Sequence, residues 1–302
     1  MRVIPPVTIT APMLTSSTIA EPSAGETLWN AATNYVIGTV VARTTTHRLY
    51  RNLIAGTDAG LPEATPTRWQ DFGPTNRFNM FDTNRTTRSS GASPLTIVLA
   101  PGVRFDSLGV CGAVGDSVEI TITNGGNTLY ANTVALRSRA SGSFFSYFFS
   151  GFVQKANVVM FGLPINAGNV ITITLINASG NAQVGAVILG ISQFVGQVQY
   201  GAADTVVNYS TVERSSIDGT ATFTPRRNVP SNRFSLLVEK QNLNSCRALR
   251  DQLNAVVALY VGLEDDGDDY FEALTKLGFA RSWSNDIEYF SHYKSEMEIE
   301  EL

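Results

Sequence analysis

The sequence predicts a mainly β protein made of several domains, and three observations support this fold class. The chain has 302 residues, which is more than a single domain usually contains. Apolar residues make up 43% of it, whereas charged residues make up only 16%, below the roughly 25% usual for soluble domains. Short apolar or alternating segments recur between turns rich in Gly, Asn and Pro, which is typical of antiparallel strands.

Residues 1–28 are predicted to form an extended N-terminal arm. The segment is rich in Pro, Ser and Thr and contains at most one edge strand. Because such an arm buries little apolar surface on its own chain, we expect it to pack on a neighbouring subunit.

Residues 29–80 are predicted to form a small three-stranded domain. "YVIGTVVAR" (35–43) and "HRLYRNLIAG" (47–56) have the composition of two short strands, separated by a Thr-rich connection. A turn-rich segment with several prolines follows and leads to Trp69.

Residues 81–198 are predicted to form a β-sandwich, because they contain evenly spaced short strands. "TNGGNT" (123–128) predicts a tight hairpin turn, since Gly and Asn tolerate positive φ. The aromatic segment "SGSFFSYFFSGF" (141–152) is expected to lie in the sandwich core or at a subunit interface. Residues 199–230 are polar and are predicted to be a linking arm, with a hairpin around "IDGT".

Residues 231–302 are predicted to form a small α+β domain. "RFSLLVE" and "VVALYVGL" have the pattern of strands, and the segment between them places Leu243, Cys246, Leu249 and Leu253 on one helical face. Asn242 or Asn244 is expected to cap this helix. The last segment alternates, which predicts a half-buried edge strand with a charged outer face. The inner side would hold Tyr289, Ser291, Tyr293, Ser295, Met297 and Ile299, and the outer side Glu288, Lys294, Glu296, Glu298 and Glu300.

Charge and cysteine content exclude several classes of partner and environment. The net charge is −4, so no strong basic field indicates nucleic-acid binding. The charge is uneven, because residues 264–302 contain 12 acidic and 3 basic residues and form either a solvated face or a docking surface for a basic partner. The two cysteines, Cys111 and Cys246, are expected to be free and buried, as in a reducing compartment. We expect no secretory signal and no membrane insertion.

Motifs for catalysis or cofactor binding do not occur in the sequence. His47 and His292 fall in different predicted domains, and neither accompanies a nucleophile motif. The acidic segment "EDDGDDYFE" (264–272) offers oxygen ligands, but its spacing differs from that of a calcium-binding EF-hand loop. We therefore expect no enzyme activity, no cofactor and no metal centre, with a solvated turn favoured over a cation site. The weak cation candidates are Asp265, Asp266, Asp268, Asp269 and Glu272.

The aromatic order in residues 29–69 resembles the small chitin- and cellulose-binding modules of families 5 and 12. Those modules have a Trp before a Y-x-x-G strand, a second strand ending in Tyr, and a later Trp after a proline-bearing loop. The matching residues are Trp29, Tyr35, Gly38, Tyr50, Pro62 and Trp69. The resemblance implies that Tyr35, Tyr50 and Trp69 contact glycan, with Trp29 mainly structural.

Two alternatives to glycan contact remain open for this module. The aromatic rings can instead form the core of a domain too small to fill its centre otherwise. The second strand departs from the family pattern because it is unusually basic at His47 and Arg48. This departure is consistent with reuse of the fold for docking to a neighbouring protein.

A wider resemblance covers most of the chain. "GETLWNAATNY", "RTTTHRLY", "PTRWQDFGPTNRFNMFD" and "FEALTKLGF" resemble segments of tailed-bacteriophage tail, baseplate or tail-fibre proteins. The resemblance implies a non-enzymatic virion component of the tail tip or baseplate, assembled in the host cytoplasm as a homo-oligomer. It further implies that the partners are other tail proteins, with host surface polysaccharide as a possible ligand. The alternative is a secreted polysaccharide-active enzyme or adhesin with a carbohydrate-binding module.

Overall fold

A computed structural model describes residues 1–139, 143–287 and 289–302 and shows a mainly β chain, as predicted. The chain divides into two units, which we describe separately. Unit 1 consists of Met1–Pro6 and Leu189–Leu302, and unit 2 consists of Val7–Ile188. No helix in the described residues is long and apolar enough to cross a membrane.

Unit 2 contains the predicted three-stranded domain, which we call the module. Its antiparallel sheet has the order β3 (Val40–Arg43), β4 (Arg48–Asn52) and β5 (Trp69–Pro74). Short 3-10 turns lie at η2 (Pro62–Ala64) and η3 (Asn79–Phe81). The first strand is shorter than predicted, because Gly38 has a φ of 88°, which interrupts an extended backbone.

The rest of unit 2 contains the strands predicted for the sandwich. A five-stranded sheet has the order β10 (Asn127–Ala135), β9 (Ser117–Asn124), β14 (Val170–Ile176), β7 (Leu95–Leu99) and β2 (Leu14–Ser17). A three-stranded sheet has the order β13 (Val158–Met160), β8 (Ser107–Cys111) and β16 (Ala186–Gly190). Every second residue of β7 and β14 is buried, so one face of the larger sheet forms a core.

Smaller elements complete unit 2. They are η1 (Ala11–Met13), β6 (Ser89–Gly91), β11 (Arg137–Arg139), α1 (Phe144–Phe149), β12 (Phe152–Gln154) and β15 (Ala182–Val184). The predicted hairpin turn joins β9 to β10, and Gly125 and Gly126 have φ values of 54° and 85°. Positive φ at both central positions is the type I′ pattern that suits a two-residue hairpin.

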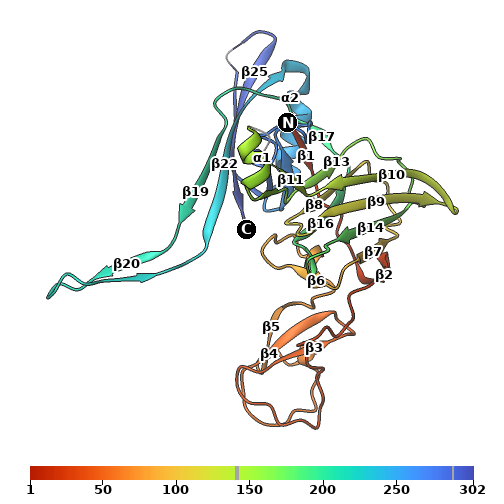
Figure 1. Ribbon diagram of the computed structural model, residues 1–302, viewed down its shortest axis with the longest axis vertical. Coiled ribbons are helices and arrows are strands. Elements are labelled where there is room, and N and C mark those ends of the chain that lie inside the picture. Colours follow the sequence, from red (N-terminus) through yellow and green to blue (C-terminus); the bar gives the residue numbers. More distant parts are fainter. Residues whose placement is uncertain (140–142, 288) are drawn as a thin grey trace. The chain divides into compact units, whose positions relative to one another are not determined.

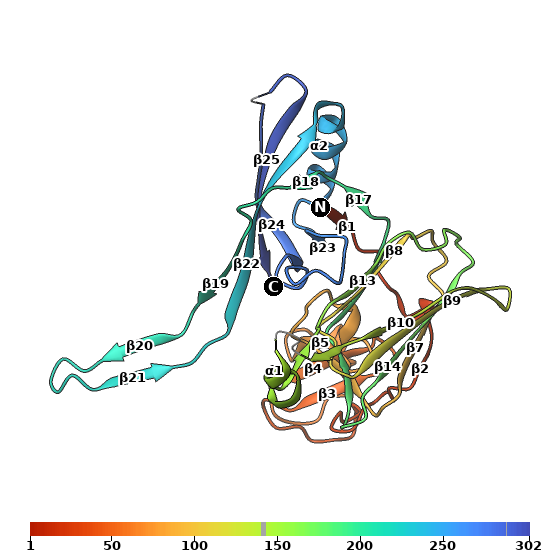
Figure 2. The ribbon, with the colours of Figure 1, turned by 45° about the horizontal axis from the view of Figure 1, so that its top comes forward.

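Unit 1 is built on one large antiparallel sheet. Its order is β17 (Gln193–Phe194), β1 (Arg2–Ile4), β23 (Ala258–Val261), β24 (Thr275–Asp286), β25 (His292–Glu301), β22 (Asn228–Glu239) and β18 (Gln197–Val198). After the short turn η4 (Lys240–Asn242), helix α2 (Leu243–Gln252) covers one face of this sheet, as Figure 2 shows. Cys246, Leu249 and Leu253 of the helical segment are buried against it, as the periodicity predicted. Asn242 occupies the N-cap position but makes no side-chain capping bond.

Two predictions about the chain ends need correction. The N-terminal segment is not a free arm, because β1 lies between β17 and β23 and β2 joins the sheet of unit 2. The last strand is not an edge strand, because β25 pairs with both β22 and β24. Its alternation is as predicted from His292 onward, whereas Tyr289 and Ser291 precede the strand and Glu288 lies outside the described residues.

A two-stranded ribbon extends from the sheet of unit 1, and we call it the arm. It comprises residues 203–232, with β19 (Ala203–Asn208) paired to the start of β22 and β20 (Thr211–Arg214) paired to β21 (Ala221–Thr224). Figure 1 shows this ribbon reaching well beyond the other strands of its sheet. The hairpin predicted around "IDGT" closes its tip, where the Ser215 amide donates to the Thr220 carbonyl at 2.9 Å.

Candidate functional site

The three rings implied to contact glycan lie in the core of the module. Tyr35, Tyr50 and Trp69 are 4%, 5% and 1% exposed and pack together with Val41. Tyr35 and Trp69 meet edge to face, with ring centroids 5.3 Å apart. This burial agrees with the alternative in which the rings form the core of the module. A sugar ring cannot stack on an aromatic face that other side chains already cover.

His47 connects the module with the segment that precedes it. It lies in the β3–β4 turn with a φ of 56°, and its Nδ1 is 2.8 Å from Oε2 of the buried Glu21 carboxylate. The imidazole also stacks on Phe78, with ring centroids 4.1 Å apart. Thr75 donates its hydroxyl to Glu21 Oε1 at 2.7 Å, so this carboxylate joins three parts of the chain. These contacts give His47 a structural role.

Arginines of the module, including Arg48 of the second strand, pair with carboxylates of the module. Three arginines lie close to carboxylates, and two of these contacts are short. The pairs are Arg48–Asp71 at 2.6 Å, Arg43–Glu63 at 2.9 Å and Arg68–Asp58 at 3.6 Å. The Arg43 guanidinium holds the pKa of the Glu63 carboxyl below its ordinary value. The predicted docking residue Arg48 therefore belongs to a set of internal ion pairs.

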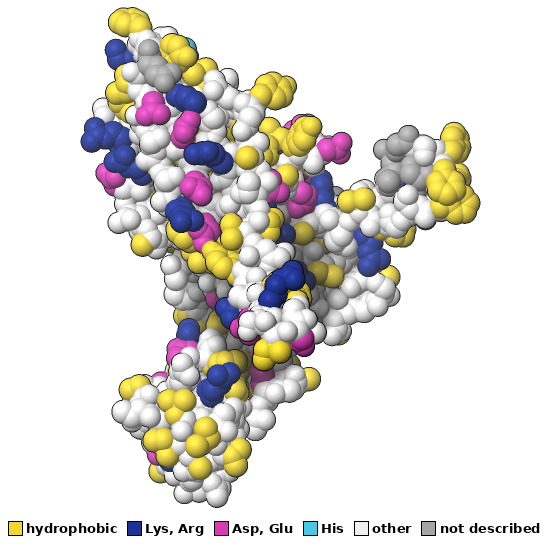
Figure 3. Space-filling model, turned by 90° about the vertical axis from the view of Figure 1, so that its left-hand side faces the viewer, with side chains coloured by type: hydrophobic (Ala, Val, Ile, Leu, Met, Phe, Trp, Pro, Cys, Tyr) yellow, Lys and Arg dark blue, Asp and Glu magenta, His cyan; other side chains and the backbone are white. Residues whose placement is uncertain are grey.

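The module instead exposes an aliphatic patch, made of Val36, Ile37, Leu53 and Ile54. Their exposed fractions are 69%, 69%, 41% and 52%. The Gly38 amide donates to the Asn52 carbonyl at 2.8 Å, which holds the two segments side by side. Figure 3 shows hydrophobic side chains gathered on this part of the molecule, which lies at the bottom of Figure 1. Such a patch is typical of a protein-docking surface.

One exposed aromatic ring of the module offers a surface for a ligand. Phe72 of β5 is 50% exposed, and the Arg51 guanidinium lies 4.3 Å from the centroid of its ring. Arg51 follows Tyr50 in β4 and therefore faces the other side of the sheet, and Phe72, which lies at an irregularity in the β4–β5 register, packs against it. Spacing from Trp69 could not predict the face of Phe72, because the β4–β5 register is irregular at this residue.

The aromatic segment at 141–152 is not part of the sandwich core. The phenylalanines described in α1 are strongly exposed, at 87%, 73%, 61% and 75% for Phe144, Phe145, Phe148 and Phe149. Residues 141 and 142 of the segment lie outside the described residues. The subunit-interface alternative stays a prediction.

The acidic loop 264–272 belongs to unit 1. Asp265 and Asp268 accept backbone hydrogen bonds from residues two positions further along the chain, as turn-forming aspartates do. Over the residues that the structure describes, no three or more His, Cys, Asp or Glu side chains are grouped so that they could hold a metal ion.

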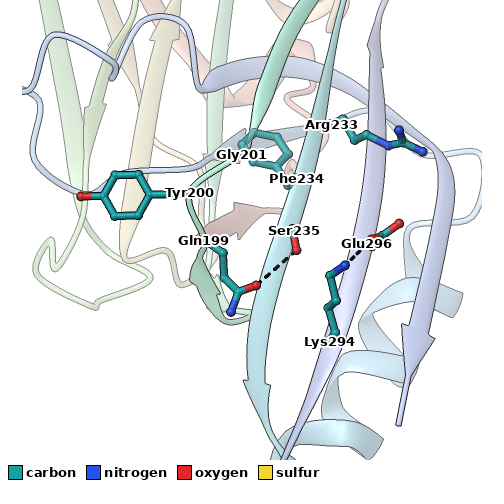
Figure 4. A pocket seen from close by; sticks show the side chains of 8 residues that line it. All are labelled: Gln199, Tyr200, Gly201, Arg233, Phe234, Ser235, Lys294 and Glu296. Carbon is teal, nitrogen blue, oxygen red and sulfur yellow. Dashed lines mark hydrogen bonds and ion pairs between the residues drawn. The ribbon is translucent and has the colours of Figure 1, made fainter. Parts of the chain in front are cut away.

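Two neighbouring cavities of unit 1 share the segment Gln199–Gly201. The first has a volume of about 370 Å³ and is lined by polar side chains of β22 and β25, including Ser235, Lys294 and Glu296. Figure 4 shows Gln199 bonded to Ser235 and Lys294 paired with Glu296, while the Tyr200 ring points away from them. The Lys294 ammonium holds the pKa of the Glu296 carboxyl below its ordinary value.

The second cavity has a volume of about 470 Å³ and lies between residues 198–202 and residues 263–274. We call it the tyrosine groove, because Tyr200 and Tyr270 both line it. The Tyr200 side chain is fully exposed and that of Tyr270 is 70% exposed. Sequence reasoning missed this groove. The only local signals were a Tyr-Gly pair at the root of the arm and a Tyr inside the acidic loop.

Comparisons with known proteins show only distant similarity. No protein-family model and no curated protein matches the chain. A variant of chitosan-binding module 1, derived from a chitosanase/glucanase of Paenibacillus sp. IK-5, is 14% identical with a TM-score of 0.25 and covers 37% of this chain and 82% of that chain. CpGH89CBM32-5 of Clostridium perfringens, in complex with GalNAc-β-1,3-galactose, is 12% identical with a TM-score of 0.24 and covers 37% and 81%. The chain thus resembles carbohydrate-binding modules distantly and in part.

Proposed function

We propose that this chain is a non-enzymatic structural subunit of a homo-oligomeric assembly, located in the tail tip or baseplate of a tailed bacteriophage. The phage assignment rests on the sequence resemblance set out above. It implies a virion component that is assembled in the host cytoplasm among other tail proteins. The structural observation that supports an assembly role is the arm of unit 1.

The arm exposes apolar side chains that a monomer leaves uncovered. Val206, Val207, Val212 and Phe223 are 55%, 47%, 55% and 59% exposed. Beyond its root the arm has only two strands, and an isolated two-stranded ribbon is at best marginally stable in water. A second protein surface would cover these side chains and stabilise the ribbon, and we propose that another copy of the chain provides it.

The cavities support a non-enzymatic role. Glycoside hydrolysis needs two carboxylates that flank the scissile bond about 5 to 10 Å apart. The two cavities described above each contain one carboxylate, Glu296 in the first and Asp268 in the tyrosine groove. A third cavity, lined in part by the end of α2, has Asp251 as the one carboxylate in its lining.

The arm gives the first test of the proposal. Val212 and Phe223 are directly opposite each other in the β20–β21 pair, so they share one face of the ribbon. We expect the double variant Val212→Ser/Phe223→Ser to lower the oligomer mass in light scattering toward the 32.6 kDa of one chain. The matched control is Thr211→Ala/Thr224→Ala, the neighbouring pair on the other face, which should keep the wild-type mass. A wild-type chain that is monomeric at micromolar concentration would refute the proposal.

A second candidate function for the module is binding of host surface polysaccharide through Phe72. The ring is half exposed beside Arg51, so it offers an apolar face and a hydrogen-bond donor to the same ligand. We expect Phe72→Ala to abolish retention of the protein on host envelope polysaccharide, whereas Gln70→Ala on the same strand leaves it unchanged. If the Phe72→Ala variant is retained on the polysaccharide as strongly as the wild-type protein, the exposed ring has no role in glycan binding.

A further inference from the structure

The tyrosine groove is apolar at its base, and the loop on one side of it is anchored in the core. Val198, Ala202, Leu263 and Leu274 contribute apolar side chains to its lining. The loop that carries Tyr270 is anchored by Phe271, which is 1% exposed. The loop backbone is further held by the Leu274 amide, which donates to the Tyr270 carbonyl at 2.9 Å. Tyr270 is therefore presented to solvent by a fixed backbone while its neighbour fills the core.

Two exposed tyrosines at one groove are suited to contact another protein. Tyr carries a large apolar ring at a small entropic cost and is enriched among residues that dominate protein interfaces. The Tyr270 amide donates to Asp268 Oδ1 at 2.8 Å, so this carboxylate is fixed beside the ring. The groove thus combines aromatic side chains with a negative charge.

The loop on one side of the groove is acidic, whereas Arg233 and Lys294 line the neighbouring cavity. Asp265, Asp268 and Asp269 are all exposed on the loop between β23 and β24. The basic residue Arg2 lies against this loop and pairs with Glu264 at 2.7 Å. A partner for this groove should therefore present an apolar surface accompanied by positive charge.

One face of the arm has this composition. Val212 pairs with Phe223 and Arg214 pairs with Ala221, and these four side chains lie on one face because strand residues alternate. The opposite face carries Thr211, Glu213, Thr222 and Thr224. Arg214 has no side-chain partner among the residues that the structure describes. The apolar and basic face therefore matches the groove in both polarity and charge, whereas the other face does not.

We propose that the arm of one copy of this chain lies in the tyrosine groove of a second copy. Val212 and Phe223 contact Tyr200 and Tyr270, and Arg214 pairs with carboxylates of the acidic loop. This inference rests on the proposed function, since it requires that the arm joins copies of the chain. Arm and groove are different surfaces, so the contact is head-to-tail, and repeated contacts form a ring or an open filament.

Mixing two defective variants tests the head-to-tail contact. The groove variant is Tyr200→Ser/Tyr270→Ser, and the arm variant is Val212→Ser/Phe223→Ser. We expect each alone to lose the wild-type oligomer mass. An equimolar mixture should form complexes of two chains, because the groove variant still has an intact arm and the arm variant still has an intact groove. In this complex the remaining arm and the remaining groove are both defective, so it cannot extend further and the mass should stop at twice 32.6 kDa.

Charge reversal gives an independent measurement. Arg214→Asp and Asp268→Arg should each lower the oligomer mass, and the two changes combined in one chain should restore it.

Tyr289→Ser is the matched control for the groove variant, because Tyr289 is 59% exposed and lies outside the groove. If the groove variant keeps the wild-type mass while the arm variant loses it, the arm docks elsewhere and only this inference fails. If the wild type is monomeric, the proposed function fails as well. A mixture that stays monomeric also overturns the groove assignment.

Discussion

At the residue scale, the buried Tyr260 in the core of unit 1 should make the protein less stable toward unfolding at alkaline pH. Its side chain is 0% exposed, and burial raises the pKa of the phenol from 10.0 to about 12. The unfolded chain therefore loses this proton at lower pH than the folded chain does. The stabilising contribution is complete below pH 10 and is lost as the pH rises from 10 to about 12.

This shift can be measured by comparing the wild type with Tyr260→Phe. We expect the free energy of unfolding of the wild type to fall by roughly 1–1.5 kcal/mol more than that of the variant between pH 9 and pH 11. Urea unfolding followed by circular dichroism gives both values. Tyr293 and Cys246 also have pKa values raised by burial, but they are present in both proteins and cancel in the difference. Equal pH dependence in the two proteins would show that the Tyr260 phenol titrates normally.

The aromatic residues of the module show what single residues in a sequence can and cannot predict. Their order identified a small compact sheet, and β3, β4 and β5 form it. The order could not decide whether the rings of Tyr35, Tyr50 and Trp69 face a ligand or one another. That depends on whether other side chains fill the centre of the module, and Val41 and Trp29 pack with the three rings there.

At the element scale, local patterns predicted strands and turns better than they predicted strand partners. Alternation identified β7, β14 and the inner face of β25, and the glycine pairs identified the β9–β10 turn. The position of β1 could not be predicted, because three residues carry no periodicity and their partner β23 lies more than 250 residues away. The internal position of β25 was missed for a different reason. Its charged outer face suggested an edge, whereas strands on both sides pair with its backbone.

The arm is an element whose existence followed from the sequence and whose use did not. The polar composition and the "IDGT" turn predicted a hairpin, and β20 and β21 form it. The difference between its two faces became visible only with the strand register, which places Arg214 beside Val212 and Phe223. The tyrosine groove needs two segments about 70 residues apart, so local patterns could not indicate it.

At the scale of the whole molecule, unit 1 is assembled from both ends of the sequence. Its large sheet needs β1 from Met1–Pro6 and all other strands from Leu189–Leu302. Val3 and Ile4 are both 0% exposed, and burial of two such side chains stabilises the unit by roughly 3–6 kcal/mol. This is comparable with the whole stability of many domains, about 5–15 kcal/mol.

Residues 189–302 expressed alone should therefore fail to unfold cooperatively in urea. A circular permutant that appends residues 1–6 through a flexible linker should restore a single cooperative transition. The linker is feasible because β25 and β1 are separated by β24 and β23, which is roughly 14 Å across the sheet. A Gly/Ser linker of about 15 residues spans that distance easily. The matched control is the same permutant with Val3→Asp/Ile4→Asp, which supplies the strand without its buried side chains and should not rescue folding. Cooperative unfolding of residues 189–302 without the added strand would show that β1 is dispensable, and that the two ends of the chain need not meet for unit 1 to fold.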